Sequence, residues 1–132
     1  MRHHSLEKWE KKLEKLLREI DDLLEDQFGQ KYRLHPARPK RGKTSNKAHD
    51  GLFNLAASFT LGSGSKFGRG YIVDIHLSTL EKIAPEIVDE IEHFALEKIR
   101  EILPNYFPGK KISADIDGNV LKIHGDISLG ML

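Results

Sequence analysis

The stretch LFNLAASFTLGSGSKFGRGYIVDIHLSTL, residues 52–80, decides the fold. In residues 52–61 apolar side chains occupy every second position, and residues 71–80 repeat that alternation. A period of two is typical of a β-strand that buries one face and exposes the other. The connector between the two runs, residues 62–70, holds four glycines, which allow the chain to reverse. The stretch therefore predicts a long antiparallel hairpin over residues 52–80.

The segments on either side of this hairpin predict helices. Residues 5–28 place apolar side chains three and four positions apart with charged side chains between them, as in an amphipathic helix. Residues 85–103 repeat the pattern, with Pro85 in the first turn and Pro104 as the expected stop. We expect the apolar stripe of the first helix to pack on the chain's own sheet. A seam with a second copy is the alternative.

A second hairpin is predicted over residues 111–124. Its signal is the dipeptide Asp117-Gly118, which favours a two-residue type I′ turn. With those two residues as the turn, Ala114 pairs with Leu121 and the apolar side chains of both strands share one face.

Together these segments predict a single α+β domain over residues 1–132, with the order helix, strand, strand, helix, strand, strand. The expected architecture is a two-layer sandwich, in which two helices cover one face of an antiparallel four-stranded sheet.

The composition excludes several classes of protein. The chain has 132 residues and no cysteine, so disulfides, thiolate metal sites and thiol nucleophiles are all excluded. No apolar run approaches the ~18 residues that cross a bilayer, so we expect no membrane partner. Because a chain without cysteine fits a reducing compartment, we expect a cytoplasmic location. We also expect no cofactor.

Positive charge is concentrated in one part of the chain. The net charge is only +1, yet residues 29–71 hold nine basic side chains and one acidic side chain. Most of the basic residues lie in a proline-containing segment without periodicity, residues 30–51, which we call the basic loop. Cationic segments attract phosphates, because each neutralised phosphate releases counterions. The alternative is a solvated loop that the acidic helices neutralise. The candidate contacts in this loop are Lys31, Arg33, His35, Arg38, Lys40, Arg41 and Lys43.

A smaller cationic cluster, Lys66 and Arg69, lies in the glycine-rich connector. Glycines there could let backbone N–H groups approach an anion, although a plain hairpin connector is the simpler interpretation. The basic loop enters the first strand and the connector leaves it. The two clusters are therefore expected at opposite ends of that strand.

Two sequence motifs fail the tests of their chemistry. Gly42-Lys43-Thr44 resembles the end of a phosphate-binding Walker loop, but Ala37 stands where that motif needs a glycine, and no strand precedes it. In the first hairpin, a symmetric register places Ser58 opposite Asp74, beside His76. Successive side chains on one face of a strand lie ~7 Å apart, so we expect a polar solvent face rather than a catalytic triad.

Three functions remain open from the sequence. The first is a small non-catalytic domain that binds nucleic acid or another polyanion through the basic loop. The second is a homo-oligomeric interaction module, a homodimer through the first helix being the simplest form. The third is a metal- or histidine-dependent hydrolase that uses His76 with Asp74, or His35 with His49; His124 could join the first pair at a metal. In the homo-oligomeric module, an apolar tail would also bury against the second copy; its residues are Ile127, Leu129, Met131 and Leu132.

Overall fold

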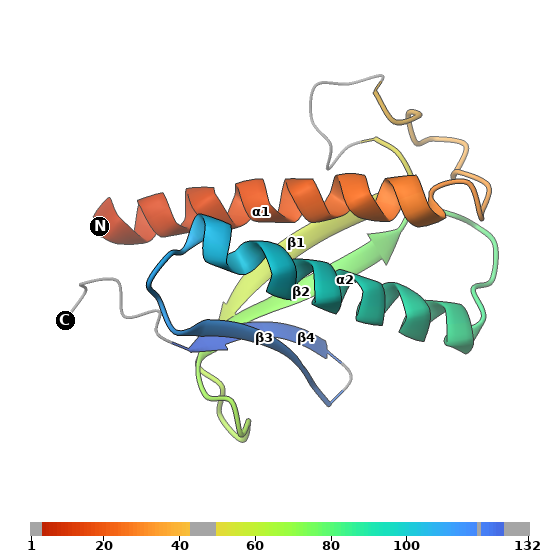
Figure 1. Ribbon diagram of the computed structural model, residues 1–132. Coiled ribbons are helices and arrows are strands. Elements are labelled where there is room, and N and C mark those ends of the chain that lie inside the picture. The colour runs from red at the N-terminus through yellow and green to blue at the C-terminus, as the bar shows by residue number, and fades with distance from the viewer. Residues whose placement is uncertain (1–3, 43–49, 119, 126–132) are drawn as a thin grey trace.

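The computed structural model describes residues 4–42, 50–118 and 120–125. The elements in these residues are α1 (His4–Phe28), β1 (Phe53–Thr60), β2 (Gly70–Leu77), α2 (Pro85–Tyr106), β3 (Ile112–Asp117) and β4 (Val120–Gly125). The predicted order of helices and strands is confirmed (Figure 1).

The strands form one sheet in the order β1-β2-β4-β3, and each neighbouring pair is antiparallel. After β2 the chain passes through α2 and returns at the far edge as β3, so β4 comes back between β2 and β3. Figure 1 shows both helices on one face, and α1 packs against β1 while α2 packs against β3. The predicted two-layer α+β sandwich is therefore confirmed. We call the side of the sheet that the helices do not cover the open face.

The apolar stripe of α1 is buried inside the chain's own core. Trp9 stacks between Tyr71 of β2 and Phe107 after α2, with ring centroids 4.8 Å and 5.0 Å away. The stripe therefore packs on its own sheet, as predicted. Within the described residues, neither helix is long and apolar enough to cross a membrane. The buried side chains of the stripe are Trp9, Leu13, Leu16, Leu17, Ile20, Leu24 and Phe28.

The register of the last hairpin differs from the prediction by two residues. Asp117 pairs with Val120, so Asp117 belongs to β3 rather than to the turn. Ala114 consequently lies opposite Ile123 instead of Leu121. A shift of two residues keeps every side chain on its predicted face, because the side-chain period of a strand is also two.

The first hairpin shows the same kind of error. Ser58 lies opposite Ile72, and Ala56 lies opposite Asp74. The predicted pairing of Ser58 with Asp74 is wrong. It took residues 62–70 as the turn, whereas β1 ends at Thr60 and β2 begins at Gly70, so the turn is residues 61–69.

The second helix runs past its expected stop. Pro104 lies inside α2, which continues to Tyr106. Proline has no backbone N–H, so Pro104 makes no hydrogen bond to the carbonyl four residues earlier, and the helix continues for two residues beyond it. The helix then closes with a bond from the Phe107 N–H to the Leu103 carbonyl, 3.0 Å.

The basic loop contains neither helix nor strand in its described part, residues 30–42 and 50–51, as predicted. Lys43 and His49 lie outside the described residues, as does the apolar tail.

Candidate functional site

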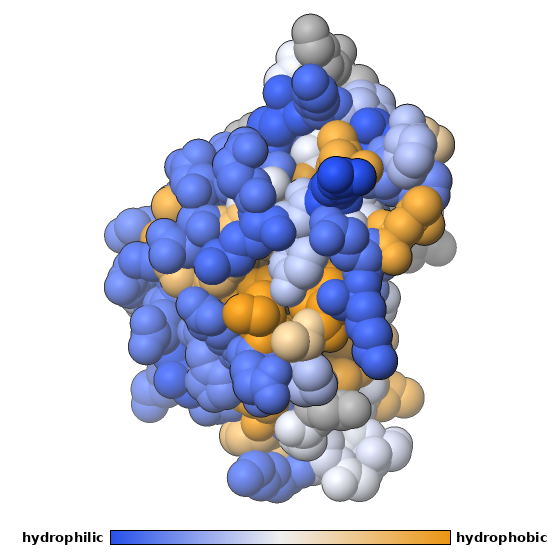
Figure 2. All heavy atoms as spheres, turned by 90° about the vertical axis from the view of Figure 1, so that its right-hand side faces the viewer, coloured by the Kyte–Doolittle hydropathy of each residue, from blue (hydrophilic) through white to orange (hydrophobic). Residues whose placement is uncertain are grey.

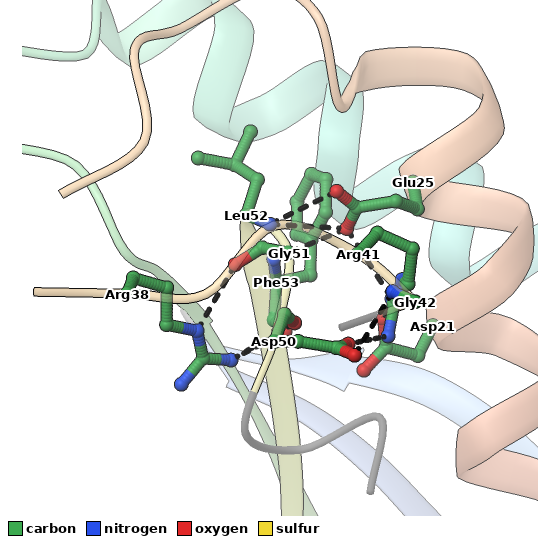
Figure 3. Close-up of polar contacts among 9 residues, drawn as sticks. All are labelled: Asp21, Glu25, Arg38, Arg41, Gly42, Asp50, Gly51, Leu52 and Phe53. Carbon is green, nitrogen blue, oxygen red and sulfur yellow. Dashed lines mark hydrogen bonds and ion pairs between the residues drawn. The ribbon is translucent and has the colours of Figure 1, made fainter. Parts of the chain in front are cut away.

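The basic loop folds back onto the second half of α1, and Arg41 is at the centre of that contact (Figure 3). One terminal nitrogen of its guanidinium donates to Asp50 Oδ1 at 2.9 Å, and the other pairs with Asp21 and with Glu25 Oε2, 3.3 Å from the latter. The side chains of Asp21 and Asp50 are only 4% and 1% exposed. Asp50 also accepts the Gly42 N–H at 3.0 Å, which fixes the end of the loop.

Arg38 binds the backbone that leads into β1. Its Nε donates to the Gly51 carbonyl at 3.0 Å, and Nη2 donates to the carbonyls of Asp50 and Phe53, each at 3.2 Å. A single guanidinium therefore satisfies three carbonyl oxygens just before and at the start of the strand. Arg38 and Arg41 both hold the loop in place.

Glu25 completes this cluster from the α1 side. Its carboxylate accepts the N–H of Leu52 at 2.9 Å and that of Phe53 at 3.3 Å. Burial raises the pKa of Glu25, and the two backbone N–H groups offset part of that rise. Gly51 makes the approach possible: it has φ of +73°, and a Cβ there would lie 2.8 Å from the Glu25 carboxylate.

The raised pKa of Glu25 leads to a prediction about pH. Between the ordinary pKa of 4.5 and the raised pKa of the folded state, the folded chain holds a proton that the unfolded chain has released, so this carboxyl contributes less stability as pH rises. We expect the free energy of unfolding of the wild type, minus that of Glu25→Gln, to fall as pH rises from about 4.5 and to level off above the folded-state pKa. Urea unfolding of both proteins between about pH 4 and 8 measures this difference. A difference that increases with pH would contradict the dominance of burial.

Three other cations of the basic loop face outward. Lys31, Arg33 and Lys40 are exposed, and among the described residues no carboxylate pairs with their side chains. Lys31 lies over the ring of Phe28, 5.9 Å from its centroid, which leaves the ammonium at the surface. The backbone N–H of Arg33 donates to the Glu81 carboxylate, which anchors the loop without using the guanidinium. The lysines and arginines in the described part of the loop thus divide into two structural arginines and three outward cations.

The loop also brings His35 beside the end of β2. There His35 and His76 line one groove with a volume of about 360 Å³. The two histidines are 41 positions apart in the sequence, so spacing could not predict that they line the same groove.

The glycine-rich connector is fixed to the open face by a buried lysine of β4. Lys122 is 2% exposed, and its Nζ donates to Ser65 Oγ at 3.0 Å and to the Gly68 carbonyl. Asp117 Oδ2 lies 3.7 Å from the same Nζ and also accepts the Ser65 hydroxyl. The connector is therefore more than a simple turn, because it closes over a charged group.

The two predicted cations of this connector take no part in the contact with Lys122, and Lys66 lies over the ring of Phe67, 5.1 Å from its centroid. Lys66 and Arg69 are exposed, while Phe67 packs on the His124 ring with centroids 4.5 Å apart. Figure 1 shows the connector and the basic loop at opposite ends of β1 and β2, as expected. The two cationic clusters therefore do not form one surface.

Among the described residues, the predicted grouping of Ser58, Asp74 and His76 does not form, and the alternative pair of His35 with His49 lies partly outside them. Asp74 and His76 are exposed on one strand, and Ser58 faces Ile72 instead of Asp74. His124 pairs across from Gly70, six residues along β2 from His76.

His124 is instead paired with Asp115. Its Nε2 lies 2.7 Å from Asp115 Oδ2, and Arg100 binds the other oxygen at 2.7 Å. These hydrogen bonds, the one with His124 first, lower the pKa of Asp115. In the described residues no three histidine, aspartate or glutamate side chains are grouped to hold a metal ion.

The acidic partners of the basic loop were missed from the sequence. Asp21 lies within the apolar stripe of α1, between Leu17 and Leu24, where a charged side chain must face the core. Asp50 is the single acid of residues 29–71. Both positions are signals that a buried cation is needed, since buried carboxylates are normally paired.

Comparison with known proteins places the chain in a family. A relative from Borreliella burgdorferi, described as "Uncharacterized protein", is 46% identical over 107 residues, which cover 81% of this chain and 84% of the relative. No solved structure matches the chain. The model of a protein family described as "Uncharacterised protein" matches residues 4–125, which include both helices, all four strands of the sheet and both cationic clusters. The chain belongs to this family.

Proposed function

We propose that this domain binds a polyanion, nucleic acid first among them, without catalysing a reaction. Among the described residues, the side chains proposed to contact the polyanion are Lys31, Arg33 and Lys40, which the fold leaves exposed. The observation that carries the proposal is the division of the basic loop. Asp21 and Asp50, the buried acids beside the loop, pair with Arg41, and within the described residues no carboxylate forms an ion pair with the side chain of any of the three outward cations.

The anchoring of the loop supports the same proposal. Arg38 and Arg41 tie the backbone to β1 and α1, and Pro36 and Pro39 restrict it further. A loop that is already ordered loses little conformational entropy when it binds. The acidic side chains elsewhere repel a polyanion and confine contact to this end of the molecule.

A salt titration tests the proposal. Labelled single-stranded and duplex oligonucleotides, heparin and polyphosphate are titrated with wild type and with the triple variant Lys31→Ala/Arg33→Ala/Lys40→Ala, and fluorescence anisotropy is measured from about 50 mM salt upward. For nucleic acid we expect the triple variant to bind more weakly. The slope of log K against log salt should fall by about 0.7 to 0.9 for each phosphate contact removed.

The matched control is Lys66→Ala/Arg69→Ala, which removes exposed cations at the other end of the strands. It should leave the affinity and the slope close to wild type. Equal losses in both variants would show a general effect of net charge instead of a site, and no binding to any of the polyanions at low salt would refute the proposal.

A further inference from the structure

The groove between the basic loop and the end of β2 has the features of a site for a flat ring. It has a volume of about 360 Å³, which lies in the range of small-molecule sites. Figure 2 looks onto this end of the molecule, where hydrophilic residues surround a smaller apolar area. The residues that line the groove are His35, Ala37, Arg38, His76, Leu77, Ser78 and Thr79.

One wall is held in place by backbone hydrogen bonds. The His35 N–H donates to the Ser78 carbonyl at 2.8 Å, and the His35 carbonyl accepts the Arg38 N–H at 2.9 Å. The ring nitrogen Nδ1 accepts the Ala37 N–H at 3.0 Å. Because Nδ1 is an acceptor, the proton of the neutral ring lies on Nε2, which remains a hydrogen-bond donor. The imidazole is therefore fixed in orientation and in tautomer.

The other wall is the end of β2. His76 is exposed and lies opposite Asn54 of β1, and the sheet holds its backbone. Leu77 and Ala37 add apolar surface to the lining of the groove. Imidazole rings and small apolar groups on a rigid frame are the surface on which bases stack.

The charges around the groove select the kind of ligand. Arg33 and Lys40 belong to the same loop as His35 and are exposed, so phosphates are attracted to the region next to the groove. A duplex keeps its bases inside the stack, whereas a single strand can present a base together with its phosphates. We infer that the groove between His35 and His76 binds a base of a single-stranded nucleic acid, whose phosphates contact Arg33 and Lys40. This inference rests on the proposed function and names its ligand.

The test separates the stacking contact from the phosphate contacts. A labelled single strand and a duplex of the same sequence are titrated over a range of salt with wild type, His76→Ala and His76→Phe. We expect wild type to prefer the single strand, and His76→Ala to weaken single-strand binding by roughly tenfold at an unchanged salt slope. His76→Phe should restore the affinity, because phenylalanine keeps a flat ring at this position. His93→Ala is the matched control, since His93 is an exposed histidine of α2 outside the groove.

The failures of the two proposals are distinguishable. The groove inference is overturned, and the proposed function stands, under three conditions together. The triple variant of the outward cations loses binding, His76→Ala binds the single strand as tightly as wild type does, and wild type binds the duplex as tightly as the single strand. A loss in His76→Ala that His76→Phe does not restore also overturns the stacking contact. If neither the single strand nor the duplex binds at low salt, the groove inference fails, and the proposed function fails with it if heparin and polyphosphate do not bind either.

Discussion

Replacing Arg41 with alanine is expected to lower the free energy of unfolding by about 3 to 5 kcal/mol. The guanidinium pairs with Asp21 and Asp50, whose side chains are 4% and 1% exposed. Without it, both carboxylates stay buried and lose this cationic partner, so a large part of their desolvation penalty is no longer offset. The expected cost comes from that desolvation more than from the lost attraction itself.

Three comparisons test this explanation. Lys40→Ala removes the neighbouring, exposed cation and should change stability by no more than about 0.5 kcal/mol. Arg41→Lys keeps the charge but loses the planar fork of donors, so its stability should lie between wild type and Arg41→Ala. Asp21→Asn should recover part of the loss when it is combined with Arg41→Ala, which a double-mutant cycle measures. Urea unfolding of the wild type and of these variants supplies the free energies.

The result that would contradict the prediction is an Arg41→Ala protein as stable as Lys40→Ala. The cluster would then hold its acids without the guanidinium, and internal neutralisation would no longer explain any part of the basic loop. The same comparison decides which variants are suitable for the binding experiments. Arg41→Ala is expected to weaken polyanion binding only by releasing the loop, so it is not a substitute for the triple variant of the outward cations.

The fold could be predicted because its signals are local. Alternation in residues 52–61 and the helical period in residues 5–28 follow from the geometry of each element alone. The registers could not be fixed in the same way. Moving Asp117 from turn to strand shifts the pairing by two residues and leaves each side chain on the same face, so the alternation is equally consistent with both registers.

The sequence could not show which cations of the basic loop are structural and which are exposed. Arg41 and Lys40 are adjacent and equally charged in the sequence, and only burial separates a structural cation from an exposed one. Asp21, which pairs with Arg41, is 20 positions away in the sequence. The sequence therefore indicated the right segment for a charged surface, but tertiary contacts decide which of its cations are at the surface.

Lys122 illustrates the same limit on the opposite side of the molecule. Its position in β4 places it on the open face, where a strand pattern predicts a solvated side chain. The connector closes over that position through Ser65 and Gly68, and the lysine becomes 2% exposed. No periodicity in residues 62–70 indicates where the connector folds.

Replacing Lys122 with methionine is expected to lower the free energy of unfolding by about 2 to 3 kcal/mol. Methionine keeps the apolar stem but removes the donors to the Ser65 hydroxyl and to the Gly68 carbonyl. Hydrogen bonds to charged groups are worth ~1.5 to 3 kcal/mol each, and part of that loss is recovered because Asp117 is 25% exposed and can be hydrated. The effect should therefore be smaller than that of Arg41→Ala, whose acids are almost fully buried.

The lysine also has a local effect that distinguishes it from a general loss of stability. If Lys122 holds the connector closed, amide hydrogen exchange in residues 62–70 should accelerate in Lys122→Met more than exchange in the core of α2. Lys66→Met is the control, because it alters an exposed lysine of the same connector and should change neither exchange nor stability appreciably. A Lys122→Met protein in which exchange accelerates equally everywhere would show that the lysine stabilises the domain as a whole without fixing the connector. One with wild-type stability would show that Ser65 and Asp117 hold the connector closed by themselves, through the hydrogen bond between their side chains.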